Sequence, residues 1–270
     1  MALRILSLNA WGGRLHDRLM PYLVQAAPDV LCLQEVVRTP SAQAAWLTYV
    51  DGDTRLPQRA HLFDEIRAAF PDHDAFFSPA GGGLLHDDEG NGFASEFGLA
   101  TLVRKSYPVI GQALDFVHGA FSADGWGPHP RARNAHGVRL FDQRTGTAVA
   151  IVQMHGLRDP EGKQDTPARR LQAEALVRLI ERLRRTGDRL VVCGDFNVLP
   201  SSVTFAALGA HGLSDLVTGR GHVDTRTSHY RKSQRFADYL LVTPEVEVVD
   251  FSVVARPEVS DHRALLLDMT

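Results

Sequence analysis

The stretch GDFNVLP, residues 194–200, follows the apolar run RLVVC and places an acid and an amide, Asp195 and Asn197, two positions apart. Side chains alternate along an extended chain, so residues at this spacing point the same way from the end of a strand. Both side chains are then positioned to face one bound group. The stretch therefore predicts a functional site at the end of a buried strand.

Polar residues close other apolar runs of the chain in the same way. They are Asn9 in LRILSLN, Gln34 and Glu35 in DVLCLQE, His155 in AVAIVQMH, Asp238 in FADYLLV, and Asp261 and His262 before RALLLDM. Any one of them is more typical of a turn cap or a backbone hydrogen bond. Asp and Glu are rarely buried unless they are paired or bind a metal, so a set of them at strand ends needs a common explanation. Carboxylate and amide oxygens are the ligands that Mg²⁺, Mn²⁺ and Ca²⁺ prefer, and the set predicts a divalent-cation site.

The composition is typical of a soluble globular protein, and the length allows one large domain or two modest ones. The chain has 270 residues, 44% hydrophobic and 23% charged, and no break in composition marks a linker. Residues 1–100 contain 7 Lys and Arg against 13 Asp and Glu, and residues 101–270 contain 22 against 19, so the parts carry −6 and +3, which sum to −3. The pI near 6.4 argues against a protein that grips long duplex nucleic acid.

The sequence predicts a cytoplasmic protein. Polar Ser7 and Asn9 interrupt the amino-terminal segment before a signal-peptide core forms, and no apolar run approaches the ~20 residues that span a bilayer. Cys32 and Cys193 lie in apolar runs, where a thiol behaves as a small hydrophobe, and we expect no disulfide between them. A serine or cysteine hydrolase is excluded, because the chain has no G-x-S-x-G motif and both cysteines are expected to be buried.

Apolar patterns predict an α/β fold in which two mixed sheets pack together with helices outside. Strands are expected at 3–9, 28–36, 74–80, 98–105, 108–117, 189–195, 236–242, 246–255 and 263–269, with a hairpin over 137–155. Helices are expected at 15–26, where Pro21 interrupts the pattern, and at 41–50, 58–70 and 167–185, the last with Thr166 as its N-cap. The glycine-rich stretches 80–92 and 118–130 are expected to be binding loops or disordered insertions, and Phe121 and Trp126 favour ligand contact for the second.

Seven motifs, taken in order, resemble those of the endonuclease/exonuclease/phosphatase superfamily with the DNase I-like fold. They are LSLNAWGG, DVLCLQEV, FGLATLVRKSYPV, QMHGL, GDFNVLPSS, RFADYLLV and SDHRALLLDM, and they span residues 3–269. The resemblance implies a four-layered α/β sandwich, formed by a single domain over residues 1–270, with two packed mixed sheets flanked by helices. It also implies a site at one edge of the paired sheets.

On the metal side, the resemblance implies that Glu35 is the principal metal-binding carboxylate, with Asn9 beside it and Asp261 as a further acid. The ion is expected to be Mg²⁺ or Mn²⁺, and Ca²⁺ is an alternative. Such an ion neutralises charge on a phosphoryl group that is under attack.

On the catalytic side, the resemblance implies that Asp195 orients or deprotonates the attacking water and that Asn197 contacts the phosphate. His262 is expected to bond a non-bridging phosphate oxygen, with Asp238 orienting its ring, and His155 is expected to lie against the phosphate. A carboxylate favours the charged form of an imidazole, so we expect Asp238 to keep His262 available as a donor near neutral pH.

Two segments differ from the pattern or add to it. Where many relatives read NTHL, this chain reads QMHGL at 153–157, so a polar contact near His155 is altered. Arg131, Arg133 and Asn134 in RARN are candidate substrate contacts, and Tyr230 in TSHYRKSQRFAD is a candidate to hold a second phosphate or a base. A solvated loop is the alternative reading of the segment around Tyr230.

The function predicted is hydrolysis of a phosphoric ester by in-line attack of an activated water, with a small or single-stranded phosphate substrate favoured. A DNA or RNA nuclease of the DNA-repair type is the alternative, because the superfamily handles both classes and the fold does not choose between them. A binding protein that kept the fold and lost the chemistry is disfavoured, since all of the predicted acids and histidines are present. The sequence leaves the oligomeric state open.

Overall fold

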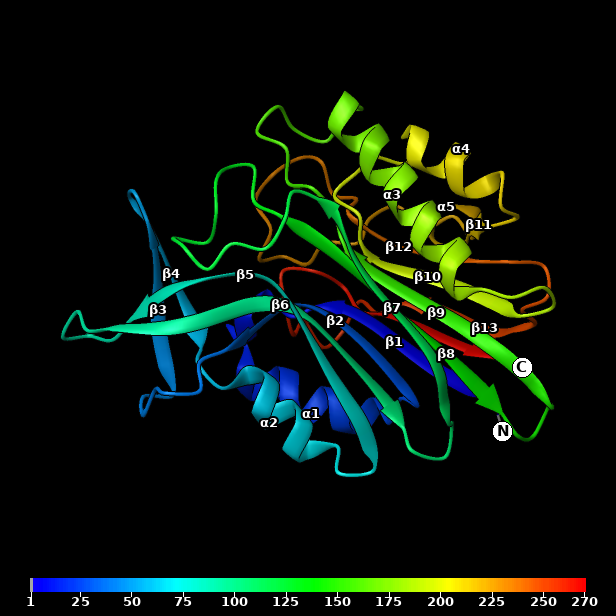
Figure 1. The fold of residues 1–270 in the computed structure, drawn as a ribbon, viewed down its shortest axis with the longest axis horizontal. Helices are drawn as coiled ribbons and strands as arrows, with labels where there is room; N and C mark the ends of the chain where they lie inside the picture. Colours follow the sequence, from blue (N-terminus) through cyan, green and yellow to red (C-terminus); the bar gives the residue numbers. More distant parts are fainter. Residues whose placement is uncertain (1) are drawn as a thin grey trace.

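The computed structural model describes residues 2–270, which form two β-sheets packed face to face (Figure 1). The first sheet has eight strands in the order β13-β14-β1-β2-β6-β5-β3-β4, and the second has six in the order β11-β12-β10-β9-β8-β7. The first contains β1 (Leu3–Asn9), β2 (Val30–Arg38), β3 (Trp46–Asp51), β4 (Thr54–Arg59), β5 (His73–His86), β6 (Gly92–Arg104), β13 (Val248–Val253) and β14 (Leu265–Met269). The second contains β7 (Val109–His118), β8 (Arg133–Asp142), β9 (Thr147–His155), β10 (Arg189–Asp195), β11 (Ser214–Asp215) and β12 (Asp238–Val242).

Helices cover the outer faces of both sheets. On the first sheet lie α1 (His16–Ala26) and α2 (Leu62–Ala69), and on the second lie α3 (Pro167–Leu183), α4 (Val203–Gly209) and α5 (Leu216–Gly219) (Figure 1). A short 3-10 turn, η1 (Trp11–Gly13), follows β1. The order helix, sheet, sheet, helix is the four-layered DNase I-like sandwich that the sequence predicts.

Apolar side chains fill the space between the sheets and the space beneath α1 and α2. The larger cluster joins the inner faces of both sheets to α3, through residues such as Ile5, Val152 and Leu176. A second cluster packs α1 and α2 against the first sheet. Each large aliphatic side chain that is fully buried contributes roughly 1.5–3 kcal/mol, so this packing holds the strand ends of the two sheets in a fixed relation.

The predicted strands are present, as are the helices expected at 15–26, 58–70 and 167–185. The expected hairpin over 137–155 corresponds to β8 and β9, which pair antiparallel. Thr166 caps α3 by accepting a hydrogen bond from the backbone nitrogen of Arg169 at 3.4 Å. Pro21 lies inside α1 without ending it.

The helix expected at 41–50 is wrong, because this segment leads into β3. Thr48, Tyr49 and Val50 are β-branched or aromatic, and such side chains pack well on a pleated surface. The strand pairs with β4 along its length, from Trp46 opposite Arg59 to Asp51 opposite Thr54. This hairpin of β3 and β4, with its turn at Gly52 and Asp53, therefore outweighs the helical pattern of the segment.

Most of the stretch 80–92, which was expected to be a loop, is strand. Gly81, Gly82 and Gly83 belong to β5 and pair with β6. A second backbone segment approaches them, since Gly82 donates to the carbonyl of Ser122 at 2.7 Å and accepts from the nitrogen of Trp126 at 2.8 Å. A Cβ at Gly83 would lie 2.5 Å from the Trp126 indole. The glycines are therefore explained by this close approach.

The stretch 118–130 contains the loop that the sequence predicts, and much of it packs on β5. The Trp126 ring lies 5.7 Å from that of Tyr49, measured between centroids. Phe121 is exposed on the same segment. Phe121 and Trp126, together with Arg38 and Glu96, line an open hollow of about 720 Å³.

Two further observations concern the helices and the cysteines. No helix within residues 2–270 is long and apolar enough to cross a membrane. Cys32 and Cys193 are buried free thiols, as expected. A hydrogen bond with Cys193, together with burial, raises the pKa of the Cys32 thiol.

Candidate active site

Three neighbouring strands of the second sheet bring polar residues side by side at one edge. His155, the last residue of β9, pairs with Asp195, the last residue of β10. Asp195 in turn pairs with Asp238, the first residue of the antiparallel strand β12. The register of the sheet therefore brings together three of the predicted residues.

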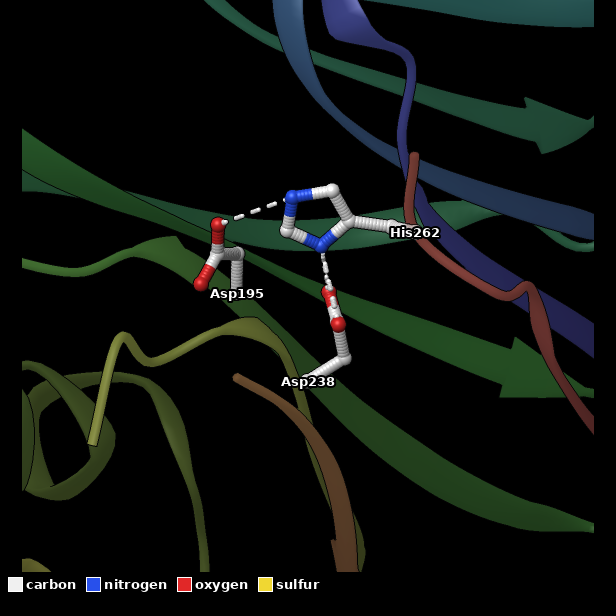
Figure 2. Close-up of side chains that lie close together, drawn as sticks. All are labelled: Asp195, Asp238 and His262. Carbon is white, nitrogen blue, oxygen red and sulfur yellow. Dashed lines mark hydrogen bonds and ion pairs between the residues drawn. The ribbon is translucent and has the colours of Figure 1, made fainter. Parts of the chain in front are cut away.

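His262 joins this group from the segment that precedes β14 (Figure 2). Its Nδ1 lies 2.8 and 2.9 Å from the two carboxylate oxygens of Asp238. Its Nε2 lies 3.7 Å from Oδ2 of Asp195. Figure 2 shows the imidazole between the two carboxylates, with one ring nitrogen directed at each. All three side chains are buried.

Burial dominates the protonation of this pair. It raises the pKa of Asp238 to about 7. Burial, with the positive charge of Arg226, lowers the pKa of His262 to about 4. Burial and the charge of Arg226 therefore act against the expectation that Asp238 keeps His262 charged near neutral pH.

Asp195 lies at the centre of the site. Its Oδ2 accepts a hydrogen bond from Nδ2 of Asn9 at 3.1 Å and lies 3.7 Å from Nε2 of His155. Its Oδ1 accepts from the backbone nitrogen of Asn197 at 3.0 Å. The side chain of Asn197 donates to the carbonyl of Gly156 at 3.2 Å. These contacts fix the plane of the carboxylate.

Glu35 reaches the site through a β-bulge in β2. The pairing of β2 with β6 shifts register between Leu33 and Val36, and Glu35 has a φ of 54°. A bulge changes the direction of a side chain relative to its strand. Oε1 of Glu35 lies 3.8 Å from Nε2 of His155, and burial raises the pKa of Glu35.

Two glycines allow the backbones at this edge to approach one another. A Cβ at Gly194 would lie 2.1 Å from the carbonyl oxygen of Met154, and the residue has a φ of 130°. A Cβ at Gly156 would lie 2.3 Å from the carbonyl oxygen of Phe196. A side chain at either position would push β9 and β10 apart where His155 and Asp195 meet.

Arg226 lies in the site and was not predicted. It is 5% exposed, its Nη1 donates to Oδ2 of Asp261 at 2.9 Å, and the same nitrogen contacts Nε2 of His262. Its guanidinium stacks on Tyr230, 4.3 Å from the ring centroid. No periodic pattern of apolar residues surrounds Arg226, so the sequence does not indicate that it is buried. Its position in TRTS, ahead of Asp238, is the one signal that could have pointed to it.

Lys163 is a second cation that the sequence did not reveal. It is 8% exposed, and its Nζ donates to the carbonyls of Phe236 and Gln234. Burial lowers its pKa to about 8, and the positive charge of Arg226 acts in the same direction. The segment that carries it, 156–166, has no helical or strand pattern that would mark it in the sequence.

The predicted substrate contacts divide into two groups. Arg133 is buried beside the site, where its Nε donates to the carbonyl of Gly156 at 3.1 Å, and Tyr230 contacts Arg226. Arg131 instead donates to Oδ2 of Asp51 at 3.0 Å and to two carbonyls of the 118–130 stretch. Asn134 donates to the carbonyl of Ser78 at 2.9 Å. Arg131 and Asn134 are thus engaged in holding the two sheets and the loop.

A known protein family matches most of the chain. The sequence matches the Endonuclease/Exonuclease/phosphatase family over residues 6–262. The chain belongs to this family. Its members are named for the cleavage of phosphate esters, and the acids and histidines gathered above are suited to that chemistry.

Solved structures of the family share the fold at low identity. A mannosyl-6-phosphatase from Bacteroides thetaiotaomicron is 16% identical, with a TM-score of 0.68 and 100% of each chain covered. The human Nocturnin catalytic domain with bound sulfate is 19% identical, with a TM-score of 0.65 over 100% of this chain and 93% of that chain. D. rerio TDP2 with a single-strand DNA product is 16% identical, with a TM-score of 0.65 over 99% and 98%. A search of curated proteins finds no match.

The departure of this family member at 153–157 has a structural explanation. Gln153 accepts from Nε2 of Gln34 at 2.8 Å and donates to Oγ1 of Thr101 at 2.8 Å. Thr101 in turn lies 2.7 Å from Nδ1 of His136. This buried network joins the two sheets behind Glu35 and His155. Gln153 therefore helps to hold together the strands that carry Glu35 and His155.

The donors present fit the divalent cation that the family implies. Oδ1 of Asp261 is buried and has no hydrogen-bond partner among the described residues. Ligand atoms of Asp195, Asp238 and His262 lie within 4.8 Å of one another, but Asp238 and His262 are already bonded together. Oδ1 of Asn9 accepts from the nitrogen of Trp11 at 2.9 Å. Of the predicted ligands, Glu35 and Asp261 therefore have the most available oxygens.

Proposed function

We propose that the protein is a metal-dependent phosphoric ester hydrolase that cleaves a P–O bond by attack of an activated water. The observation that carries the proposal is that Nε2 of His155 and Nε2 of His262 both lie 3.7 Å from the same oxygen, Oδ2 of Asp195. A carboxylate between two imidazoles can take a proton from water while the rings bond the phosphoryl oxygens. Family membership supports the reaction class.

Asp195 is the proposed base that orients and deprotonates the water. The hydrogen bonds from Asn9 and from the backbone of Asn197 hold its carboxylate in one plane, so it meets the water without reorganisation. Asn197 is also the proposed phosphate contact from the same loop. In-line attack requires this fixed placement, since a well-oriented pair of reactants gains much of its rate from positioning.

His262 and His155 are the proposed donors to non-bridging phosphoryl oxygens. Asp238 orients His262 through Nδ1, which leaves Nε2 directed at Asp195 and the phosphate position. His155 lies between Asp195 and Glu35, at 3.7 and 3.8 Å. Negative charge that grows on the phosphoryl oxygens strengthens bonds to both rings in the transition state.

Glu35 and Asp261, with Asn9 beside them, are the residues that would hold the cation. The proposed ion is Mg²⁺ or Mn²⁺, with Ca²⁺ as an alternative, because the donors are oxygens. When bound, the ion neutralises negative charge on the phosphoryl group.

The proposed substrate is a small or single-stranded phosphate ester. The net charge of −3 and the pI of 6.4 support this, because a protein that binds duplex DNA usually has a basic surface. A nuclease of the DNA-repair type is the second candidate, and the similarity in fold to TDP2 solved with a single-strand DNA product favours it. The proposal includes a cytoplasmic location, which the two free thiols support.

A substrate panel tests the proposal. Phosphomonoesters, phosphodiesters, and single- and double-stranded DNA and RNA would be assayed with Mg²⁺, Mn²⁺ and Ca²⁺, and after chelation with EDTA. We expect hydrolysis that EDTA abolishes and Mg²⁺ or Mn²⁺ restores, with preference for a small ester. Steep inhibition of cleavage by salt together with preference for DNA would identify a nuclease. Full activity in EDTA would overturn the metal dependence.

A further inference from the structure

Two buried arginines approach the reaction centre from separate parts of the chain. Arg133, on β8, is 7% exposed, and its positive charge lowers the pKa of His155 after the larger effect of burial. Arg226 is 5% exposed and contacts His262. The charges of both arginines act on Glu35 and on Asp195. Arg133 donates to the carbonyl of Gly156, the residue after His155, so each imidazole that faces Oδ2 of Asp195 has a guanidinium near it.

Both guanidinium groups keep donors that nothing in the described chain uses. The Nε of Arg226 is buried and has no hydrogen-bond partner among residues 2–270. The Arg133 guanidinium donates through Nε and Nη1 to the carbonyls of Gly156 and Ala132, and within the described residues no bond engages Nη2. A buried donor without a partner costs stability, so the retention of the Arg226 guanidinium beside the proposed phosphate site indicates a ligand.

The backbone of Arg226 is held rigidly. Its carbonyl accepts from Nη2 of Arg235 at 2.7 Å and from Nε of Arg263 at 2.9 Å. The neighbouring nitrogen of Thr227 donates to the carbonyl of Asp261 at 3.0 Å, and the Tyr230 ring supports the guanidinium plane. Arg226 is therefore placed before any substrate arrives, which avoids the entropic cost of ordering a long side chain on binding.

We propose that Arg133 and Arg226 form an arginine pair that selects a terminal phosphate, so that the preferred substrates are phosphomonoesters. The inference rests on the proposed function and names the substrate class of that site. A monoester phosphate carries about two negative charges near neutral pH and has three terminal oxygens. A diester has a single negative charge and two terminal oxygens.

The chemistry of the pair matches the monoester. A guanidinium presents parallel N–H donors that fit phosphate oxygens, and a charge-assisted hydrogen bond is about twice as strong as a neutral one. Two such groups, with the Lys163 ammonium near Asp195 and Asp238, offset a dianion better than a monoanion. A diester would place an ester substituent against one of the buried arginines. The arginine pair thus favours phosphomonoesters through charge attraction. It disfavours phosphodiesters because the ester substituent would desolvate a buried arginine.

The test compares two esters with the same leaving group, p-nitrophenyl phosphate and methyl p-nitrophenyl phosphate. The variants are Arg226→Ala and Arg226→Lys, and the control is Arg231→Ala, which removes the same charge from an exposed position of the same segment. The wild type should prefer the monoester. Arg226→Ala should lower kcat/KM for the monoester about 100-fold and for the diester about tenfold or less. Arg226→Lys should recover part of the loss, and Arg231→Ala should leave the preference unchanged.

Binding of inorganic phosphate, measured by calorimetry with Mg²⁺ present, separates this inference from the proposed hydrolysis. Wild-type protein should bind phosphate, and Arg226→Ala should weaken that binding at least tenfold. If Arg226→Ala does not fold, Arg226→Lys carries the same comparison. Equal losses of kcat/KM on both esters, or unchanged phosphate binding, would overturn the proposed arginine pair. Neither result would contradict the proposed hydrolase activity. Arg226-dependent phosphate binding without turnover of either ester would support the pair and refute the hydrolase.

Discussion

Replacing Asp238 by Asn tests how the site depends on the residue that orients His262. The carboxylate lies 2.8 and 2.9 Å from Nδ1, both groups are buried, and the amide has nearly the same shape. The substitution removes a hydrogen-bond acceptor that can carry negative charge, and with it the stabilisation of positive charge on His262 as the phosphoryl oxygens gain negative charge. A hydrogen bond to a charged group contributes about 1.5–3 kcal/mol. Since about 1.4 kcal/mol corresponds to tenfold in rate, Asp238→Asn should lower kcat roughly 10- to 150-fold.

The assay is steady-state hydrolysis of p-nitrophenyl phosphate with Mg²⁺, with thermal unfolding measured in parallel. KM should change little, because the charge acts mainly as the phosphoryl oxygens gain negative charge. Asp115→Asn makes the same chemical change at an exposed position of β7 and should leave kcat unaltered. A kcat for Asp238→Asn within threefold of wild type, with the fold intact, would show that His262 does not rely on this carboxylate.

Three further changes probe the metal side, the backbone and the pH response. Glu35→Gln should lower kcat/KM at least about 100-fold and raise the Mg²⁺ concentration needed for half activity, and unchanged Mg²⁺ dependence would contradict its role. Gly194→Ala should cost about 3 kcal/mol, because its Cβ would lie 2.1 Å from the Met154 carbonyl at a φ of 130°, and the Tm should fall by about 6 to 12 °C in a thermal scan. Burial lowers the pKa of His136 to about 4, below the unfolded value of about 6.5, so the unfolded state takes up this proton first and about 3 kcal/mol is lost as pH falls from 6.5 to 4. His136→Leu should reduce the slope of unfolding free energy against pH in urea titrations, and an unaltered slope would assign the acid sensitivity to other groups.

The sequence predicts those parts of the molecule in which local pattern and tertiary packing agree. The strand ending at Asp195 and the capped helix after Thr166 are of this kind. The helix predicted over 41–50 was wrong because residues 46–51 form a hairpin with residues 54–59, and this pairing outweighs the helical pattern. The loop predicted at Gly81 to Gly83 was wrong because the backbone that approaches these glycines lies some forty positions further along the chain, where no local pattern reveals it.

The site shows the same division. Asp195, Asp238 and His262 stand next to apolar runs and are visible as polar residues out of place. Arg226 and Lys163 stand in irregular segments, and only the folded chain shows that they are buried. The lowered pKa of His262 was also beyond the sequence, because it comes from burial in the folded chain and from the charge of Arg226.

Because Asn9 and Glu35 stand on one sheet and His155, Asp195 and Asp238 on the other, the alignment of the reactive groups depends on apolar contacts between the sheets. Heating, pressure or a core substitution that lets the sheets slide by a fraction of an ångström would misalign the chemistry well before the chain unfolds. The proposed catalytic rate is therefore expected to respond to changes in core packing. Substitutions that repack the core of this protein for heat resistance would also change the proposed turnover.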